Sequence, residues 1–389
     1  MKLTFLVLLC GAYACSTNLY PDRPCGSNLN NLWLDVVAVV DSSQGMTADG
    51  LATVGGSIAT IFGDSKIGAS STNPRTTRLG LVTYNYGVQR VADLKKYRSA
   101  DEVTEGIMND LTTLSNNQTS LIAKGLQEAQ NLLFEQSFGT ERDHYKKVVI
   151  VFASAYRGTG AEDPAPVANR LKTRGVKIIT VAYDQGGEAD IVEQLSKIAS
   201  TGFAFNKDGV VKKVQNALLQ VNCFCPSNHW TQYRTGTEEA KKFYGTCIQP
   251  VGMSATWRVA RLSCSRRWNN TYLASEFSQE KHDFIFNTVQ SSNVISPPYK
   301  YHIGLNRESG MWQWEQPKES VLVRGWFNWG QGYPIGGSGL SAGANVENEH
   351  GFAEWRNFGP TDSKAADSYV CETPACDTDN YCDKNVNDH

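Results

Sequence analysis

A short polar stretch, "DSSQG" at residues 41–45, follows the apolar run "VVAVV". Asp41 contributes a carboxylate, and Ser42 and Ser43 contribute hydroxyl groups, which are the kind of oxygen ligands that a hard divalent cation prefers. The same side chains are suited to capping a turn, because aspartate and serine accept hydrogen bonds from the backbone amides that follow them. The stretch therefore has two interpretations, a metal site or a strand that ends in a turn, and we favour the turn.

Motifs for nucleotide binding and for nucleophilic catalysis are absent from the same half of the sequence. The glycine-rich stretch "DGLATVGGSIATIFGDSKIG" contains neither a Gly-x-Gly-x-x-Gly motif nor a Gly-Lys-Ser/Thr phosphate loop. His144 is the one histidine before residue 223, and no Gly-x-Ser-x-Gly motif accompanies it. We expect no enzyme and no catalytic residues, and we keep a hydrolase with converging nucleophile and base as a third alternative.

The segments around this stretch alternate between strand and helix patterns. Four nearly continuous apolar runs predict buried strands, namely "LWLDVVAVVD", "RLGLVTYN", "KVVIVFAS" and "VKIITVAYD". Apolar residues at three- and four-residue spacing predict helices at 49–62, 101–111, 121–134, 164–174 and 190–198, and in "DGVVKKVQNALLQ". The alternation predicts a doubly wound, mainly parallel α/β sheet with one hairpin at "TYNYGVQRVADL", and ligands of such sheets bind beyond the carboxyl ends of the strands.

Residues 31–220 resemble the von Willebrand factor type A domain, whose first strand typically ends in Asp-x-Ser-x-Ser and supplies three ligands of a metal-ion-dependent adhesion site. Asp41 and Ser43 match this motif, whereas Gly45 replaces the last serine. The resemblance places Thr119 or Ser120 at the family's threonine ligand and Ser154 at its second aspartate. The degenerate metal site that it implies comprises Asp41, Ser43, Thr119, Ser120 and Ser154.

The altered ligand set bears on cofactors and partners. Asp41 remains the lone carboxylate, and one carboxylate offsets the dehydration of a divalent cation poorly. We therefore expect no certain cofactor and at most weak binding of Ca²⁺ or Mg²⁺. Asn117-Gln118-Thr119 is an N-glycosylation acceptor, so a glycan on Asn117 would stand at the rim of the site. The domain is then a scaffold or a metal-independent binding surface.

The second half of the sequence is rich in tryptophan, with Trp33 the one tryptophan before residue 223. Helix patterns occur in "TGTEEAKKFY" and "LASEFSQEKHDFIFNTVQ". A series of landmarks resembles the C-type lectin-like domain over residues 225–372, which implies an α+β fold: "CPSNHW", "FYGTC", "WRVARLSC", "YHIGL", "WQWE", "GWFNW" and "SYVCE". The pairing of the two domains resembles the secreted lectin-like families of nematodes.

Sugar-binding members of the lectin-like family chelate calcium with Glu-Pro-Asn or Gln-Pro-Asp in a long loop and with Trp-Asn-Asp in the next strand. Here the loop reads "GYPIGG", and the candidate for the second half is "WRN" at 355–357 or the region around Asp362 and Asp367. We therefore expect no calcium-dependent sugar site. Exposed aromatic rings stack on sugars, so we place a ligand-binding surface at Tyr333, Trp355 and Asn357. The tryptophans expected in the core are Trp312, Trp314 and Trp329.

The cysteines indicate an oxidising compartment. "MKLTFLVLLCGAYAC" has the layout of a secretory signal peptide, and its removal takes Cys10 and, with cleavage after Cys15, leaves eight cysteines. The lectin-like resemblance implies four disulfides, the last two of which would close the first domain and clip the tail: Cys225–Cys247, Cys264–Cys371, Cys25–Cys223 and Cys376–Cys382. Connectivity does not follow from the sequence by itself.

The expected organisation is a signal peptide at 1–15, an N-terminal segment at 16–30, a type A-like domain at 31–222, a C-type lectin-like domain at 223–373 and a disulfide-clipped acidic tail at 374–389. The formal net charge of -2 gives no basic field for nucleic acid, and no later apolar run is long enough to span a membrane. A second glycosylation acceptor begins at Asn269.

These observations predict a secreted, extracellular, non-catalytic recognition or adhesion protein. The resemblance suggests that it binds glycans or microbial surfaces in innate defence, so the expected partner is a glycan or an extracellular protein ligand. The alternative is a structural protein of the extracellular matrix whose domains contact other proteins and bind no sugar.

Overall fold

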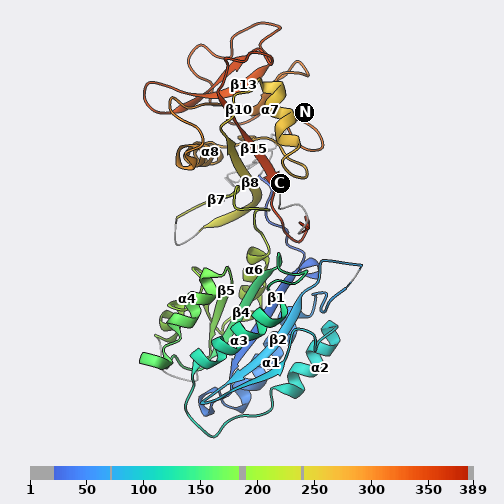
Figure 1. Ribbon diagram of the computed structural model, residues 1–389, viewed down its shortest axis with the longest axis vertical. Coiled ribbons are helices and arrows are strands. Elements are labelled where there is room, and N and C mark those ends of the chain that lie inside the picture. Colours follow the sequence, from blue (N-terminus) through green and yellow to red (C-terminus); the bar gives the residue numbers. More distant parts are fainter. Residues whose placement is uncertain (1–21, 71, 184–189, 238–240, 384–389) are drawn as a thin grey trace, which may run out of the picture. The chain divides into compact units, whose positions relative to one another are not determined.

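The computed structural model describes residues 22–70, 72–183, 190–237 and 241–383. They form two compact units, which are labelled by their elements in Figure 1. The α/β unit comprises Arg23–Val251, Leu262–Tyr272 and the chain from Val370 onward, and the α+β unit comprises Asp22, Gly252–Arg261 and Leu273–Tyr369. The predicted signal peptide lies outside the described residues.

A six-stranded sheet forms the centre of the α/β unit, with strand order β3-β2-β1-β4-β5-β6. Neighbouring strands are parallel except for β2 and β3, which form an antiparallel hairpin. The strands are β1 (Leu34–Asp41), β2 (Arg78–Tyr84), β3 (Val88–Ala92), β4 (Lys146–Ala153), β5 (Lys177–Ala182) and β6 (Ala204–Asn206). The prediction of a doubly wound sheet with one hairpin is confirmed.

Helices cover both faces of this sheet because its strands are apolar on both faces. The helices are α1 (Ala48–Phe62), α2 (Ala100–Asp110), α3 (Ile122–Gln136), α4 (Ala165–Thr173), α5 (Ile191–Ser196) and α6 (Val210–Val221). On one face, Val36 and Val40 of β1 pack with α1, α2 and α6. On the other face, Val39 packs with α3, α4 and α5. Gly125 lets α3 approach β1 closely, since a Cβ at this position would lie 2.6 Å from Cγ1 of Val39.

A buried ion cluster holds the amino end of β1. The carboxylate of Asp35 accepts hydrogen bonds from Nε and Nη2 of Arg78, over 2.9 and 2.6 Å, and from Nε of Arg142 over 2.9 Å. Burial by itself would raise the pKa of Asp35, but the two guanidinium groups lower it. The cluster therefore ties β1 to β2 and to the loop before β4.

The α/β unit also contains a hairpin of β7 (Thr231–Thr235) and β8 (Lys242–Val251). The helix expected in "TGTEEAKKFY" is wrong for residues 242–244, which begin β8. Lys242 and Phe243 pair with Thr235 and Arg234, so that pairing in a sheet outweighs the local helix pattern. Residues 238–240 lie outside the described part of the chain.

The α+β unit is built around strands in the order β12-β11-β10-β15, with β13 paired to β10 and β14 paired to β13. The elements from residue 252 onward are α7 (Trp257–Ser265), β9 (Tyr272–Leu273), α8 (Gln279–Ser292), β10 (Lys300–Asn306), β11 (Gln313–Trp314), β12 (Val321–Leu322), β13 (Ala342–Glu347), β14 (Ala353–Phe358) and β15 (Ser368–Pro374). Helix α8 follows the N-cap Ser278, whose hydroxyl accepts a hydrogen bond from the backbone nitrogen of Lys281.

Four disulfides join the cysteines in the pairs that the lectin-like resemblance implies: Cys25–Cys223, Cys225–Cys247, Cys264–Cys371 and Cys376–Cys382. The first of them encloses the whole of the six-stranded sheet. Within the described ranges, none of the helices combines the length and the apolar character that crossing a bilayer requires.

Candidate functional site

The carboxyl end of β1 brings together four of the five residues expected at the metal site. Asp41 is wholly buried, and its Oδ1 accepts a hydrogen bond from the backbone nitrogen of Ser43 over 2.9 Å. Its Oδ2 accepts hydrogen bonds from Oγ of Ser120 over 2.9 Å, from the backbone nitrogen of Ser154 over 3.1 Å and from Oγ of Ser154 over 2.6 Å. Asp41 therefore joins the end of β1 to the loop before α3 and to the end of β4.

Thr119, the fifth expected residue, and Gly45, which replaces the last serine of the motif, lie outside this set of contacts. Of the two candidates for the threonine ligand, Ser120 is the one whose hydroxyl contacts Asp41, whereas the backbone nitrogen of Thr119 donates to Oδ1 of Asn117 over 2.8 Å. A Cβ at Gly45 would lie 3.1 Å from Oγ of Ser154. A serine at position 45 would therefore crowd the hydroxyl group that now replaces the second aspartate.

The donor set around Asp41 does not fit a divalent cation. One feature favours a cation, because the buried Oγ of Ser43 has no hydrogen-bond partner among the described residues. However, one carboxylate does not offset the dehydration of a dication, and Oδ2 of Asp41 already faces a backbone N–H that cannot rotate away. In the part of the chain that the structure describes, no group of three or more His, Cys, Asp or Glu side chains is arranged to hold a metal ion. Asp41 instead closes a hydrogen-bonded junction.

The long loop of the α+β unit is held by Asn357, a buried residue of β14. Its side-chain oxygen accepts a hydrogen bond from the backbone nitrogen of Ile335 over 2.7 Å. Its side-chain nitrogen donates to the carbonyl oxygens of Ile335 and Leu340, over 2.8 and 3.1 Å. Both amide hydrogens are thus used on the loop main chain, and a ligand would have to displace the loop in order to use them.

Trp355 is wholly buried and belongs to a polar network in the core of the α+β unit. Its indole nitrogen donates to Oε2 of Glu276 over 2.7 Å, and the side-chain nitrogen of Asn345 donates to Oε1 of Glu276 over 2.8 Å. Nδ1 of His282 lies 2.9 Å from Oε2 of the same carboxylate. Burial by itself would lower the pKa of His282, but the carboxylate of Glu276 raises it. Burial by itself would raise the pKa of Glu276, but His282 lowers it.

These contacts correct the prediction for Trp355 and Asn357, which are buried, whereas Tyr333 of the expected ligand-binding set stays a prediction. Residues 353, 355 and 357 point into the core while 354 and 356 are partly exposed, as the two-residue period of a strand requires. Trp355 and Asn357 therefore share the inward face of β14. Tyr333 is partly exposed, and the guanidinium carbon of Arg356 lies 5.5 Å from the centre of its ring. An exposed surface consequently has to be sought in other side chains.

Apolar side chains do reach solvent in the neighbouring loops. Met311, Phe327 and Phe352 are 57%, 56% and 67% exposed. The residues that follow the two phenylalanines are hydrogen-bonded to each other, because the side chain of Asn328 donates to the carbonyl oxygen of Ala353 over 2.9 Å. We call Met311, Trp312, Phe327, Trp329 and Phe352 the aromatic surface.

Two tryptophans connect this aromatic surface to the core. Trp314 is buried as expected, but Trp312 and Trp329 are partly exposed. The rings of Trp312 and Trp329 meet edge to face at 4.8 Å, and Trp329 meets the buried Trp355 at 5.7 Å. The stretch "GWFNW" is a landmark of the fold, and its pattern does not separate the exposed Phe327 from its less exposed neighbours.

Comparison with protein families assigns both halves of the chain. The model of the von Willebrand factor type A domain matches residues 35–217, and that of the C-type lectin domain matches residues 253–373. The chain carries a type A domain followed by a C-type lectin domain. Both are generally non-catalytic recognition domains. The disulfides are consistent with an extracellular location.

Two relatives share parts of this architecture. C-type lectin domain-containing protein 160 of Caenorhabditis elegans is 26% identical in an alignment of 381 residues, and the match covers 92% of this chain and 56% of that protein. The chain thus spans little more than half the length of that relative. Rheacalcin-2 of Rhea americana is 28% identical over 137 residues, which cover 33% of this chain and 90% of that protein. The second match covers about the extent of the lectin domain.

Solved structures show weaker likeness. Proximal thread matrix protein 1 from the mussel byssus, with zinc in its metal-ion-dependent motif, is 19% identical, has a TM-score of 0.42 and covers 53% of this chain and 52% of its own. Human lithostathine is 21% identical, with a TM-score of 0.30, and the match covers 38% of this chain and 90% of that chain.

Proposed function

We propose that this protein is a secreted, non-catalytic recognition protein that binds glycans, including those on microbial surfaces, through the aromatic surface of its lectin domain and without a divalent cation. The observation that carries this proposal is the exposure of Phe327 and Phe352, whereas the amide of Asn357 in β14 is already used by the main chain of the long loop at Ile335. In this proposal, binding to microbial glycans contributes to host defence.

The chemistry of the aromatic surface suits a sugar ring. Aromatic rings offer flat apolar faces on which the C–H groups of a sugar pack, and nearby polar groups fix the orientation of the hydroxyl groups. Glu354, which points outward from β14, supplies such a group: its carboxylate lies beside Gly330, the residue after Trp329, and accepts a hydrogen bond from Asn348 over 2.7 Å. Neither feature requires calcium.

The type A domain acts as a scaffold in this proposal. Both oxygens of Asp41 accept hydrogen bonds, and the hydroxyl groups of Ser120 and Ser154 donate to the same oxygen, so these contacts tie β1 to the loop before α3 and to the end of β4. The side chains of Asn117 and Asn269 are exposed and accessible to glycosylation.

Binding of the purified full chain to an array of glycans, and to whole bacterial and fungal cells, tests the proposal in calcium and again in a chelator. We expect equal binding in both solutions and a loss of at least ten-fold in the Phe327→Ala/Phe352→Ala variant. The matched control is Val259→Ala, which removes an exposed apolar side chain on α7 outside the aromatic surface. Binding that requires calcium would overturn the metal-independent proposal.

The same experiment distinguishes glycan binding from the alternative function, a structural protein of the extracellular matrix. A chain that binds no glycan and no cell in either solution, but retains an extracellular protein on the aromatic surface, is a structural interaction protein. The phenylalanine variants would then lose the protein partner, and the glycan proposal would be rejected.

A further inference from the structure

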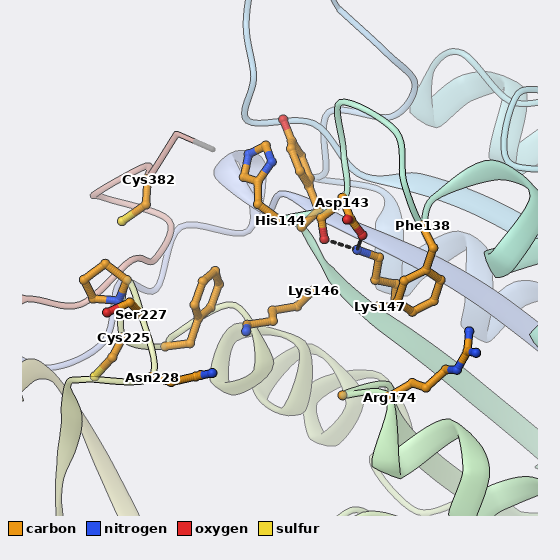
Figure 2. A pocket seen from close by; sticks show the side chains of 14 residues that line it. Phe138, Asp143, His144, Lys146, Lys147, Arg174, Cys225, Ser227, Asn228 and Cys382 are labelled. Atoms are coloured by element: carbon orange, nitrogen blue, oxygen red, sulfur yellow. Dashed lines mark hydrogen bonds and ion pairs between the residues drawn. The ribbon is translucent and has the colours of Figure 1, made fainter. Parts of the chain in front are cut away.

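A pocket of about 240 Å³ lies at the amino end of β4, whereas the Asp41 junction lies at carboxyl ends of the strands. Its walls come from the loop before β4, the turn between α4 and β5, and the segment 224–228 that follows α6 (Figure 2). All of these residues belong to the α/β unit. Neither the metal-ion motif nor the aromatic surface contributes to this pocket.

Three cationic side chains line the pocket, namely Lys146, Lys147 and Arg174. Lys147 is already paired: its ammonium group lies 3.6 Å from Oδ1 of Asp143 and donates to the carbonyl oxygens of Arg142 and Asp143. The one carboxylate among the lining residues, that of Asp143, is therefore taken. The pocket has a surplus of positive charge.

The charges of Lys146 and Arg174 lack an anionic partner among the described residues. The ammonium nitrogen of Lys146 lies 4.1 Å from the centre of the Phe224 ring, and the guanidinium carbon of Arg174 lies 4.2 Å from the centre of the Phe134 ring. Aromatic faces stabilise a cation only in part, and a half-buried ammonium group has lost much of its hydration. The ammonium group of Lys146 is thus available to an anion in the pocket, whereas the guanidinium group of Arg174 points toward Phe138 and away from Lys146 (Figure 2).

Neutral donors complete the lining. Figure 2 shows the side chains of Lys146 and Asn228 reaching toward each other from opposite walls of the pocket. Ser227 and Phe224 lie on the same wall as Asn228. An ammonium group facing an amide across a pocket of this size suits a compact group with several acceptor oxygens.

We propose that this pocket binds a compact oxyanion group, a sulfate, phosphate or carboxylate, with Lys146 as its cationic contact and Asn228 as a neutral donor, while Arg174 adds positive charge to the pocket without contacting the group. The group is carried by a free ion or by an acidic monosaccharide, and the arms of the experiment distinguish these sources. The site does not depend on the glycan-binding role of the aromatic surface, and variants of the two regions test them separately.

The titratable groups around the pocket set its pH dependence. Burial, together with the charges of Lys147 and Lys177, lowers the pKa of Lys146 to about 8. Burial lowers the pKa of His144, so this ring adds no positive charge at neutral pH, and Asp143 stays paired with Lys147. A bound anion stabilises the ammonium form, so the affinity is expected to fall as the pH rises through about 8.

Calorimetric titration of the purified full chain tests the site, with sodium sulfate as the first probe and sodium chloride added to hold the ionic strength constant. We expect sulfate binding that weakens at least ten-fold in Lys146→Met, which keeps the apolar stem against Phe224, and by a much smaller factor in Arg174→Met, which removes only a more distant charge. Lys146→Arg, which keeps the charge, is expected to retain binding. The matched control is Lys177→Met, which removes a charge close to Lys146 but outside the pocket lining.

The source of the oxyanion follows from further probes. Inorganic phosphate, glucuronate and galactose 6-sulfate are titrated in the same way. Tighter binding of a sugar acid than of inorganic sulfate, with the same dependence on Lys146, identifies an acidic monosaccharide. Equal binding identifies the oxyanion alone. Absence of binding by all four probes, or equal affinity in wild type and Lys146→Met, overturns the proposal.

Discussion

Ser154 donates two hydrogen bonds to one oxygen of Asp41, from its backbone nitrogen over 3.1 Å and from its hydroxyl group over 2.6 Å. The resemblance to the type A family implies an aspartate at the position of Ser154. A serine in place of this aspartate removes one negative charge. Ser154 and Asp41, which would both be cation ligands in the family, are here a hydrogen-bond donor and its acceptor. The junction at the end of β1 is therefore stable without the charge that a cation would bring.

This arrangement predicts how the site responds to ions. Wild-type protein should give no heat of binding with Ca²⁺ or Mg²⁺ at micromolar concentrations, and its unfolding temperature should not change when a chelator is added. Gly45→Ser/Ser154→Asp, which restores the family ligand set, should be less stable in the chelator because two carboxylates face each other, and should be stabilised by Mg²⁺. Wild-type binding that disappears in Asp41→Ala would contradict this reading.

Asp35 provides a test of the buried ion cluster. Asp35→Asn leaves Arg78 and Arg142 with buried, uncompensated charges, so we expect a loss of about 3–5 kcal/mol in the free energy of unfolding in urea. The control is Glu135→Gln, which breaks an ion pair with Arg90 at the surface and should cost much less.

The same carboxylate also predicts a pH dependence. Because the folded-state pKa of Asp35 is lowered, its contribution is present above its unfolded pKa and is lost as the pH falls through the folded value. The stability difference between wild type and Asp35→Asn should therefore shrink in acid. A difference that stays constant from neutral pH to pH 3 would argue against an ionised Asp35.

The pair of His282 and Glu276 predicts an opposite trend on the alkaline side. The pKa of His282 is raised in the folded protein, so its stabilisation is full below the unfolded value of about 6.5 and is lost as the pH rises through the folded value. Thermal unfolding of wild type and His282→Asn from pH 5 to pH 9 should show the advantage of wild type declining above pH 6.5. His350→Asn, at an exposed position, is the control and should show no such decline.

Lys146 predicts a gain of stability in alkali. Its pKa is lowered from 10.5 to about 8, so the unfolded chain binds more protons than the folded chain between these values. The stability of wild type relative to Lys146→Met should therefore rise across this interval, by at most about 1.4 kcal/mol per pH unit. Urea unfolding of both proteins at pH 7.5, 9 and 10.5 measures the difference. If the stability difference between the two proteins does not change with pH, the pKa of Lys146 is not lowered and its ammonium group is hydrated in the folded protein.

The sequence predicted the sheet of the type A domain well because its information is local. Runs such as "VVAVV" and "VVIVF" are apolar on both faces, which is the signature of a buried parallel strand, and the helices between them follow a regular spacing. The position of Asp41 could be predicted for the same reason, because Asp41 lies at the end of such a run. Its partners Ser120 and Ser154 were predicted from the resemblance to the type A family.

Long-range pairing explains what the sequence did not predict. Trp355 was expected near a ligand, but the pairing of β14 with β13 fixes which of its alternating residues face the core. Residues 242–244 carry a helix pattern and yet form a strand, because β7 is beside them. No local sequence pattern predicted the pocket that we propose for an oxyanion. Lys146 and Asn228 are far apart in the sequence, and both line this pocket because the tertiary structure brings their segments together.

The disulfide between Cys25 and Cys223 has a mechanical consequence. It closes a loop of 198 residues that contains every strand of the type A sheet. Tension applied between the residues before Cys25 and the residues after Cys223 passes from one sulfur to the other and bypasses β1 to α6. Such a force therefore does not extend the strands and helices of the type A sheet while this disulfide is intact.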